Sequence, residues 1–163
     1  MTQLEYERAV DLYADDVYRI AYGSTHSRED AKDIVQDVFA KLWQIRNKQD
    51  FESGEHLKYW LIRVAINYTN SFWRSFLRRR SVPLDDAGDI GVEQEFHDVI
   101  EELDLLSPKE RQIIHLYYYE DIPLADIAKL IGISEEAARK RLSRARKTLG
   151  EKIKENDDGQ AEI

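Results

Sequence analysis

Basic side chains near the C-terminus are the residues of this sequence most suited to a specific chemical task. They lie within residues 133–149 (ISEEAARKRLSRARKTL), although the whole chain carries a formal net charge of −8. Arginine can form two parallel hydrogen bonds with guanine, and lysine can bind a phosphate. The cluster therefore predicts a surface for a polyanion such as DNA, with a solvated helix face as the alternative. Its members are Arg139, Lys140, Arg141, Arg144, Arg146 and Lys147.

A second stretch, residues 59–80, mixes aromatic and basic side chains. Aromatic rings can stack on unpaired bases while neighbouring arginines hold the backbone, which is the chemistry of single-strand binding. The alternative is that the rings are core residues, and we expect this of Tyr68, Phe72 and Phe76. The other aromatic members are Tyr59, Trp60 and Trp73, and the basic members are Arg63, Arg74, Arg78, Arg79 and Arg80.

Catalytic chemistry has little support in the sequence. The four histidines are scattered, and there is neither an HExxH motif nor a glycine-rich phosphate loop. The absence of cysteine removes thiolate metal sites and cysteine nucleophiles. His115 falls in an apolar run and is expected to be a core or boundary residue. We therefore expect no enzyme activity, metal or cofactor, and the acidic N-terminus and lack of long apolar runs favour a cytoplasmic protein without membrane insertion.

Helices must position these side chains, because the sequence contains only 7 glycines and 3 prolines and has long uninterrupted stretches. Apolar residues at helical spacing predict helices at about 4–23, 27–46 and 57–80. In the first of these helices, Leu4 and Leu12 are expected to face the core. The fold class that follows is all-α.

An acidic linker is expected to separate two small helical domains. Residues 81–91 contain proline, glycine and aspartate without helical spacing, and residues 85–104 contain many Asp and Glu but no Lys or Arg. Such a composition is typical of a flexible connection. The expected organisation is a domain at 1–80, a linker at 81–94, a second domain at 95–155 and a frayed tail at 156–163.

The second domain has the spacing of a helix-turn-helix. Ser107, followed by Pro108 and Glu110, predicts a helix start with a capping box. Apolar residues then mark a short helix at 124–131, Gly132 suits a tight turn, and Ser134 can cap the last helix. On that last helix Ala138, Leu142, Ala145 and Leu149 share one side, and Arg139, Lys140, Ser143, Arg144 and Lys147 share the other.

The order of these segments resembles the extracytoplasmic-function (ECF) group of the sigma-70 factors of bacterial RNA polymerase. The resemblance covers nearly the whole chain, from about residue 4 to 154, and each motif is moderately specific. The segments that carry it are 33–43 (DIVQDVFAKLW), 59–67 (YWLIRVAIN), 106–111 (LSPKER) and 134–149. Ala137, Ala138 and Lys140 stand where many relatives have threonine, valine and serine, so the promoter sequence is not inherited from a relative.

The resemblance implies a promoter-specificity subunit that binds core RNA polymerase, recognises −35 and −10 promoter elements and helps to melt the duplex. Kinship alone implies an anti-sigma protein as a further partner. The resemblance also assigns residues to each task. Those for core polymerase are Asp33, Gln36, Asp37, Phe39 and Lys41. Those for the −10 element are Tyr59, Trp60, Arg63, Asn67, Arg74 and Arg78, and those for the −35 element are Arg139, Lys140, Ser143, Arg144 and Lys147.

Several alternatives remain open at the level of sequence. Of the two large aromatic residues in the polymerase-binding segment, we expect Trp43 to be internal and Phe39 to be the exposed anchor. Asn67 either reads a base that has left the stack and is held by a nearby loop, or it caps a helix. The acidic linker either mimics RNA phosphates or is a solvated tether. An autonomous helix-turn-helix regulator would explain the C-terminal half but leaves residues 33–43 without a role.

Overall fold

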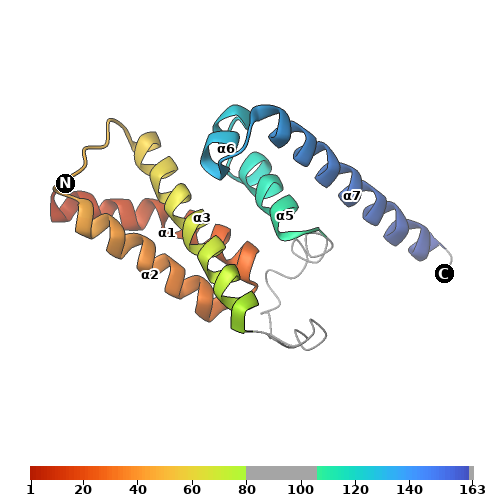
Figure 1. Cartoon of the computed structure of the whole chain (residues 1–163), viewed down its shortest axis with the longest axis horizontal. Helices are drawn as coiled ribbons and strands as arrows, with labels where there is room; N and C mark the ends of the chain where they lie inside the picture. Colours follow the sequence, from red (N-terminus) through yellow and green to blue (C-terminus); the bar gives the residue numbers. More distant parts are fainter. Residues whose placement is uncertain (80–105, 162–163) are drawn as a thin grey trace. The chain divides into compact units, whose positions relative to one another are not determined.

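The computed structural model describes residues 1–79 and 106–161, and it divides the chain into two compact units, Met1–Gly91 and Val92–Ile163 (Figure 1). Within the described residues the regular elements are all helices. The predicted fold class, all-α with two helical units, is therefore confirmed. The linker predicted at 81–94 and the acidic block up to residue 104 lie outside the described residues.

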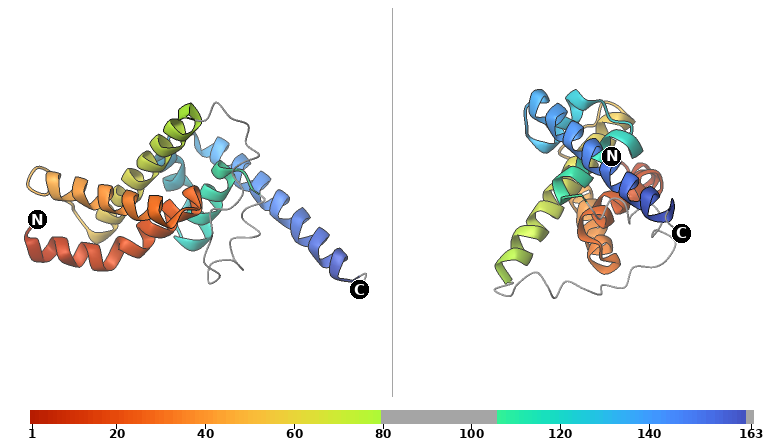
Figure 2. Two further views of the ribbon diagram at one scale, coloured as in Figure 1. Left: turned by 90° about the horizontal axis from the view of Figure 1, so that it is seen from below. Right: turned by 90° about the vertical axis from the view of Figure 1, so that its right-hand side faces the viewer.

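The first unit consists of α1 (Gln3–Thr25), α2 (Arg28–Ile45) and α3 (Gly54–Arg79). Each of these helices packs against the other two, as the two further views in Figure 2 also show. The break that was predicted between the second and third helices is a loop of residues 46–53. The three helices therefore form one small bundle with a shared core.

Side-chain caps explain where the first two helices begin. Thr2 and Glu5 form a capping box, in which the Thr2 backbone N–H donates to Glu5 at 2.7 Å and lowers the pKa of that carboxyl. The predicted cap at Ser27 is confirmed, because its hydroxyl accepts the Asp30 N–H at 3.2 Å. α1 ends at His26, which adopts a left-handed conformation with φ of 53°.

The core of the first unit comes from one stripe on each helix. Its fully buried side chains include Val17, Val38, Leu42, Leu61, Ile62 and Ile66. The expectation for α1 was partly wrong, since Leu4 and Leu12 are 57% and 67% exposed. The buried side of α1 is centred on Ala9, Val17 and Ile20, and a helix that turns about 100° per residue carries both leucines away from that side.

The second unit contains α5 (Pro108–Ile114), the π-helical turn η3 (His115–Tyr119), α6 (Leu124–Ile131) and α7 (Glu135–Ala161). The predicted capping box of Ser107 and Glu110 is present, with Pro108 at the start of the helix. η3 was not predicted. α7 reaches Ala161, so residues 156–161, which were expected to form a frayed tail, belong to this helix.

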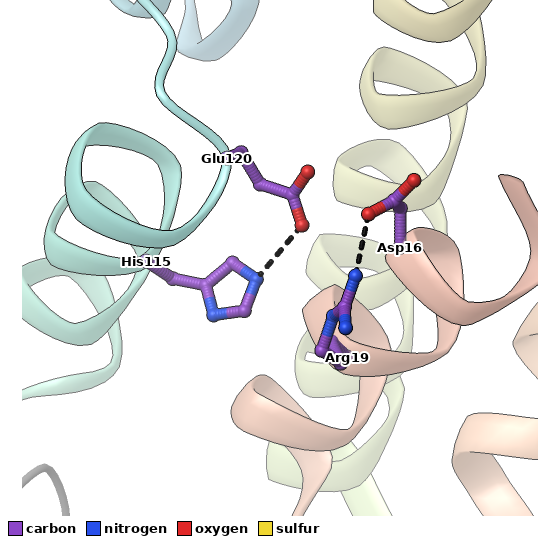
Figure 3. A network of polar contacts seen from close by, with 4 residues as sticks. All are labelled: Asp16, Arg19, His115 and Glu120. Carbon is purple, nitrogen blue, oxygen red and sulfur yellow. Dashed lines mark hydrogen bonds and ion pairs between the residues drawn. The ribbon is translucent and has the colours of Figure 1, made fainter.

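Each unit contains a short contact between a nitrogen-bearing side chain and a carboxylate (Figure 3). In α1, Arg19 and Asp16 lie 2.6 Å apart on consecutive turns. In the second unit, His115 Nε2 lies 3.4 Å from Glu120 Oε1, and the Glu120 side chain is almost completely buried. The expectation that His115 is a boundary residue is confirmed. No helix in the described ranges, 1–79 and 106–161, has the length and apolar character needed to cross a membrane.

The fully buried Leu42 provides a test of the first unit's core. We expect Leu42→Ala to lower the free energy of unfolding by about 2–5 kcal/mol, because it leaves a cavity. Leu12→Ala, the same change at an exposed site, should alter it by less than about 0.5 kcal/mol. Urea unfolding followed by tryptophan fluorescence reports on this unit, because Trp43, Trp60 and Trp73 all lie in it. Equal losses in the two variants would contradict the assigned core.

Candidate nucleic-acid interface

The turn between α6 and α7 has the geometry that a helix-turn-helix requires. Gly132 has φ of +75°, a left-handed conformation that favours glycine, and the Ile133 N–H donates to Ala128 O at 3.0 Å. The predicted cap of the last helix is present, since Ser134 Oγ accepts the Ala137 N–H at 3.1 Å. The small side chain of Ala138 is fully buried. The turn therefore sets the direction of α7 without backbone strain, because the residue with positive φ is a glycine and has no Cβ.

α7 presents one buried and one exposed side. Ala138, Leu142 and Ala145 face the core of the second unit. On a helix that turns about 100° per residue, the line directly opposite them contains Glu136, Lys140, Ser143 and Lys147. Arg139 and Arg144 flank this line on its two sides. All residues predicted to contact the −35 element, namely Arg139, Lys140, Ser143, Arg144 and Lys147, are exposed and share this side of α7.

Two of these cations are paired with glutamates at the start of α7. Arg139 lies 3.6 Å from Glu135, and Lys140 lies 3.4 Å from Glu136. All four side chains are more than half exposed, so the pairs contribute little stability. They do offset positive charge at the first turn of the helix. The spacing of four residues could have revealed both pairs in the sequence.

Arg146, at the edge of the basic cluster, is held by tyrosines of η3. Its Nε donates to the Tyr118 hydroxyl at 2.5 Å, and its guanidinium lies 5.3 Å and 5.4 Å from the rings of Tyr117 and Tyr118. The hydrogen bond to Tyr118 raises the pKa of the Arg146 guanidinium. Arg146 therefore contributes to the contact between α7 and η3 rather than to the centre of the exposed face.

A polar and basic stripe runs along α3. Arg63, Asn67, Arg74 and Arg78 are exposed and lie within about 60° of one another around the helix, on the side opposite its buried residues. From Arg63 to Arg78 the stripe extends about 22 Å at 1.5 Å per residue. Sequence reasoning missed Asn70, which is exposed on the same stripe, and its spacing of three from Asn67 is the signal that could have found it.

The position of Asn67 decides one open alternative. Asn67 lies in the interior of α3, because the helix continues without a break to Arg79. The interpretation of Asn67 as a helix cap is therefore wrong, and the residues next to it form no loop. The nearest irregular segment is the loop of residues 46–53 that precedes α3.

All aromatic residues of α3 whose side chains are described are half-buried. Trp73 Nε1 donates to Ser24 O at 3.1 Å and to Ser24 Oγ at 3.0 Å, so Trp73 links α3 to the end of α1. Trp60 is half-buried and its ring lies 5.6 Å from that of Phe51 in the preceding loop. Tyr59, Tyr68 and Phe72 are also half-buried, and the side chain of Phe76 lies outside the described ones.

A ridge of Asp33, Gln36 and Asp37 lies on the exposed side of α2, and Lys41 is exposed at its flank. The expectation for the two large aromatic residues was wrong in both cases. Phe39 is only 5% exposed, whereas Trp43 is 38% exposed and continues the ridge. α2 buries Val38, Phe39 and Leu42 together, and this rotation places Trp43 at the surface.

Contacts from α1 and from the end of α2 hold Trp43 at the surface. Its ring meets the ring of Tyr6 edge-on at 4.9 Å, and the guanidinium of Arg46 lies 3.6 Å from its centre. The Tyr6 hydroxyl donates to Phe39 O at 3.1 Å. Burial raises the pKa of Tyr6. These contacts make Trp43 a preformed apolar feature at one end of the acidic ridge.

A groove of about 340 Å³ lies between α2 and α3. Three aspartates and three α3 residues with hydroxyl groups give it a polar, acidic wall, and Ile34 and Phe72 contribute apolar surface. Asp33 and Asp37 belong both to the groove and to the ridge, so the two features are continuous. Its lining residues are Asp30, Asp33, Ile34, Asp37, Tyr68, Ser71, Phe72 and Ser75. Within the described ranges, no group of three or more His, Asp or Glu side chains is placed to hold a metal ion.

Comparison with known proteins agrees with this arrangement. Two protein-family models match the chain: Sigma-70 region 2 over residues 9–80 and Sigma-70, region 4 over residues 96–149. The chain belongs to the ECF group of the sigma-70 family. The first match contains α2 and α3 with their exposed residues, and the second contains the helix-turn-helix. The resemblance inferred from the sequence motifs is therefore confirmed.

Several relatives align along most of this sigma-70 family chain. RNA polymerase sigma factor SigV of Bacillus subtilis is 26% identical over 149 residues, which cover 89% of each chain. ECF RNA polymerase sigma factor SigE of Mycolicibacterium smegmatis is 28% identical over 156 residues, covering 88% of this chain and 60% of the relative. A probable RNA polymerase sigma factor, RfaY of Xanthomonas campestris pv. campestris, is 30% identical over 173 residues, but the chain spans only 42% of its length.

Two solved structures have the same fold. The sigma factor RpoE of Bartonella quintana, crystallised with the anti-sigma factor NepR, matches with a TM-score of 0.74 and 25% identity. The match covers 92% of this chain and 97% of that one. CnrH, solved in complex with the cytosolic domain of CnrY, matches with a TM-score of 0.70 and 21% identity, covering 94% and 90% of the two chains.

The left-handed turn at Gly132 can be tested against a second glycine of the same unit. Gly132→Ala should lower the free energy of unfolding by about 1–2 kcal/mol, because a Cβ is strained at a φ of +75°. Gly150→Ala should raise it by about 0.5–1 kcal/mol, because Gly150 lies within α7 and a Cβ there meets nothing within 4 Å. Thermal unfolding followed by far-ultraviolet circular dichroism measures both. Changes of the same sign would contradict the assigned turn.

Proposed function

We propose that this chain is a promoter-specificity subunit that joins core RNA polymerase, selects −35 and −10 promoter elements and assists melting of the duplex near the start site. The observation that carries the proposal is that one chain combines three distinct surfaces: an acidic ridge ending in an exposed tryptophan on α2, a basic stripe on α3 and a basic helix-turn-helix face on α7. An autonomous DNA-binding regulator has no use for the first surface. The chain acts as a cytoplasmic initiation factor and not as an enzyme.

The ridge of α2 supplies the contact with the polymerase. Asp33, Gln36 and Asp37 offer hydrogen-bond acceptors, and Trp43 offers an apolar anchor that is already held in place. Interfaces typically concentrate their binding energy in such aromatic anchors surrounded by polar groups. The acidic wall of the neighbouring groove suits a basic side chain of the partner. Core polymerase therefore meets this unit through α2.

The stripe of α3 suits a melted strand. Arg63, Arg74 and Arg78 can hold successive phosphates, and Asn67 has both a donor and an acceptor with which to read a base edge. Extracting a base from the stack costs about a few kcal/mol, because its stacking and pairing with neighbouring bases are lost. Contacts to the extracted strand along the stripe offset that cost. Tyr59 and Trp60 lie at the start of the same helix, where stacking can add to it.

Association with the polymerase is needed because the DNA-binding surfaces are weak alone. Affinity for duplex DNA depends largely on release of counterions by basic residues. The net charge of −8 opposes approach to DNA, and two of the cations of α7 are paired with glutamates. Anchoring by the polymerase places both surfaces near their DNA targets. An anti-sigma protein that covers the surfaces would control the subunit, and RpoE of Bartonella quintana was solved with such a partner.

A direct test of the proposal is reconstituted transcription on a genomic promoter library. Addition of the chain to core polymerase should produce specific run-off transcripts, and binding to the same promoters should require the core. An autonomous regulator would bind promoter DNA without the polymerase and direct no transcripts. Tight, specific binding by the isolated chain together with no affinity for core polymerase would overturn the proposal.

The acidic ridge can be tested by charge removal. The double variant Asp33→Asn, Asp37→Asn should weaken binding to core polymerase by about 1.5–3 kcal/mol for each hydrogen bond lost to a charged group. Titration of a fluorescently labelled chain with core polymerase measures the Kd. The double variant Asp11→Asn, Asp15→Asn, which removes the same charge from exposed sites of α1, is the matched control and should leave the Kd unchanged. Equal Kd values for all three proteins would contradict the assigned interface.

The role of Asn67 can be tested by measuring open-complex formation. Asn67→Ala should slow open-complex formation more than it weakens the closed complex, because the contact forms only with the extracted base. Permanganate footprinting measures opening, and gel shift at low temperature measures closed-complex binding. A promoter with a pre-melted −10 region is the control and should restore most of the lost rate. A defect of equal size on both templates would contradict the role in base capture.

A further inference from the structure

One side of α1 faces away from the core and carries exposed residues in a single line. Their spacing of four, four, three and four positions keeps them within about 80° of one another around the helix. The line extends about 22 Å along the helix. Isolated exposed leucines are common on protein surfaces, but Leu4 and Leu12 lie on the same line and are 57% and 67% exposed. We call this set the outer line of α1, and its members are Leu4, Arg8, Leu12, Asp15 and Arg19.

The charged members of the outer line differ in their pairing. Arg19 is paired within its own helix, because its guanidinium lies 2.6 Å from the Asp16 carboxylate. Arg8 and Asp15 are exposed, and neither forms an ion pair with any residue that the structure describes. The outer line therefore offers one unpaired cation and one unpaired anion, with Leu12 between them.

The outer line is complementary to its own reverse. Its midpoint lies between residues 11 and 12, and about this point Arg8 corresponds to Asp15 and Leu4 corresponds to Arg19. A two-fold axis at the midpoint would bring a second copy of α1 alongside in antiparallel orientation. Arg8 of each copy would then lie opposite Asp15 of the other, and Leu12 would lie beside its own copy. Leu4 would meet the methylene stem of Arg19, whose charge is already paired.

Other arrangements of two α1 helices bring like charges together. In a parallel pair, Arg8 would face Arg8 and Asp15 would face Asp15. Sliding the antiparallel pair by one turn in one direction would place Arg8 opposite Arg19. Sliding it in the other direction would place Asp15 opposite Leu4 and beside Glu5. Charge complementarity therefore selects the antiparallel arrangement about residues 11 and 12.

We infer that the outer line of α1 is a self-association surface through which two copies of this chain form a weak antiparallel dimer. Burial of the leucines supplies the affinity, whereas the exposed ion pairs mainly fix the orientation. A contact between two single helices is smaller than the roughly 1,200 Å² of stable complexes, so the dimer dissociates at the low concentrations of a binding titration. The interface uses no residue of the acidic ridge of α2, the basic stripe of α3 or the exposed side of α7. The inference does not depend on the proposed function.

Single cysteines can test the position of the axis, because the chain contains no cysteine of its own. Residue 12 lies beside its own copy in the dimer, so Leu12→Cys should form a disulfide-linked dimer under a mild oxidant. Leu4→Cys is the matched control at a similarly exposed site. The two copies of residue 4 lie about 22 Å apart along the helix, whereas a disulfide requires Cα atoms within about 7 Å. Non-reducing electrophoresis measures both yields, and equal yields would overturn the inference.

Charge reversal tests the pairing of Arg8 with Asp15. Arg8→Glu or Asp15→Arg alone places like charges at both symmetry-related contacts and should raise the Kd of the dimer by about tenfold or more. The combined variant Arg8→Glu, Asp15→Arg exchanges the two charges and should restore a Kd close to that of the wild type. Sedimentation equilibrium at micromolar concentrations measures the Kd, and circular dichroism checks helix content. A combined variant as weak as the single ones would overturn the inference, as would a wild-type chain that stays monomeric at every concentration.

Asp11 provides a further check, because it is exposed on the flank of the outer line, about 60° from Arg8. In the dimer the two Asp11 carboxylates lie on the same flank beside the axis and repel each other. Asp11→Asn should therefore lower the Kd of the dimer. Glu7→Gln removes the same charge from a site about 100° from Arg8 and should leave the Kd unchanged. A Kd that Asp11→Asn does not lower would contradict this position of the axis.

Discussion

Burial of one side of α3 against α1 and α2 is the constraint on which the first unit depends. An isolated helix has little stability in water, so packing of its apolar stripe supplies most of what keeps it folded. Leu61, Ile62 and Ile66 are almost fully inaccessible, and burial of each such side chain contributes about 1.5–3 kcal/mol. Once this side of α3 faces the core, the residues on its opposite side must face the solvent. The alignment of Arg63, Asn67 and Arg74 along the surface is thus a consequence of core packing.

The same logic separates surfaces of opposite charge within one small unit. α2 exposes aspartates and a tryptophan, and α3 exposes arginines, while both helices bury their apolar sides in a common core. A protein partner and a nucleic acid can therefore be bound at once without competition for residues. In the proposed function, the basic side of α7 in the second unit adds a further surface for DNA. Sites that are individually weak gain affinity when they are joined, because binding at one raises the effective concentration at the next.

Local signals made much of this architecture predictable from sequence. The caps at Ser27, Ser107 and Ser134 and the turn at Gly132 depend on residues only a few positions apart, and all four are present. Features that depend on neighbouring helices were not predictable in the same way. Helical spacing allowed either Phe39 or Trp43 to be internal, and only the position of α1, whose Tyr6 contacts both residues, distinguishes them.

Other differences arose because the sequence carries no distinct signal for them. Leu4 and Leu12 fit an apolar stripe by residue type, yet they remain exposed because α1 buries another side. The π-helical turn η3 has no composition of its own, although it places Tyr117 and Tyr118 against Arg146. Asn67 resembled a cap because it follows an apolar run, but the helix continues through it. In each case tertiary packing, rather than local preference, decided the outcome.

The glutamates that face Arg139 and Lys140 have a consequence for how the protein moves through a cell full of DNA. The first turns of α7 carry cations that are paired with glutamates of the same helix, so binding to DNA of unrelated sequence releases few counterions. The time that the protein spends on such DNA is therefore short. Genomic DNA offers an enormous excess of wrong sites that would otherwise sequester a small cationic subunit. By remaining unattached, the free subunit stays available for capture by the polymerase, and the genome is then searched by the assembled complex.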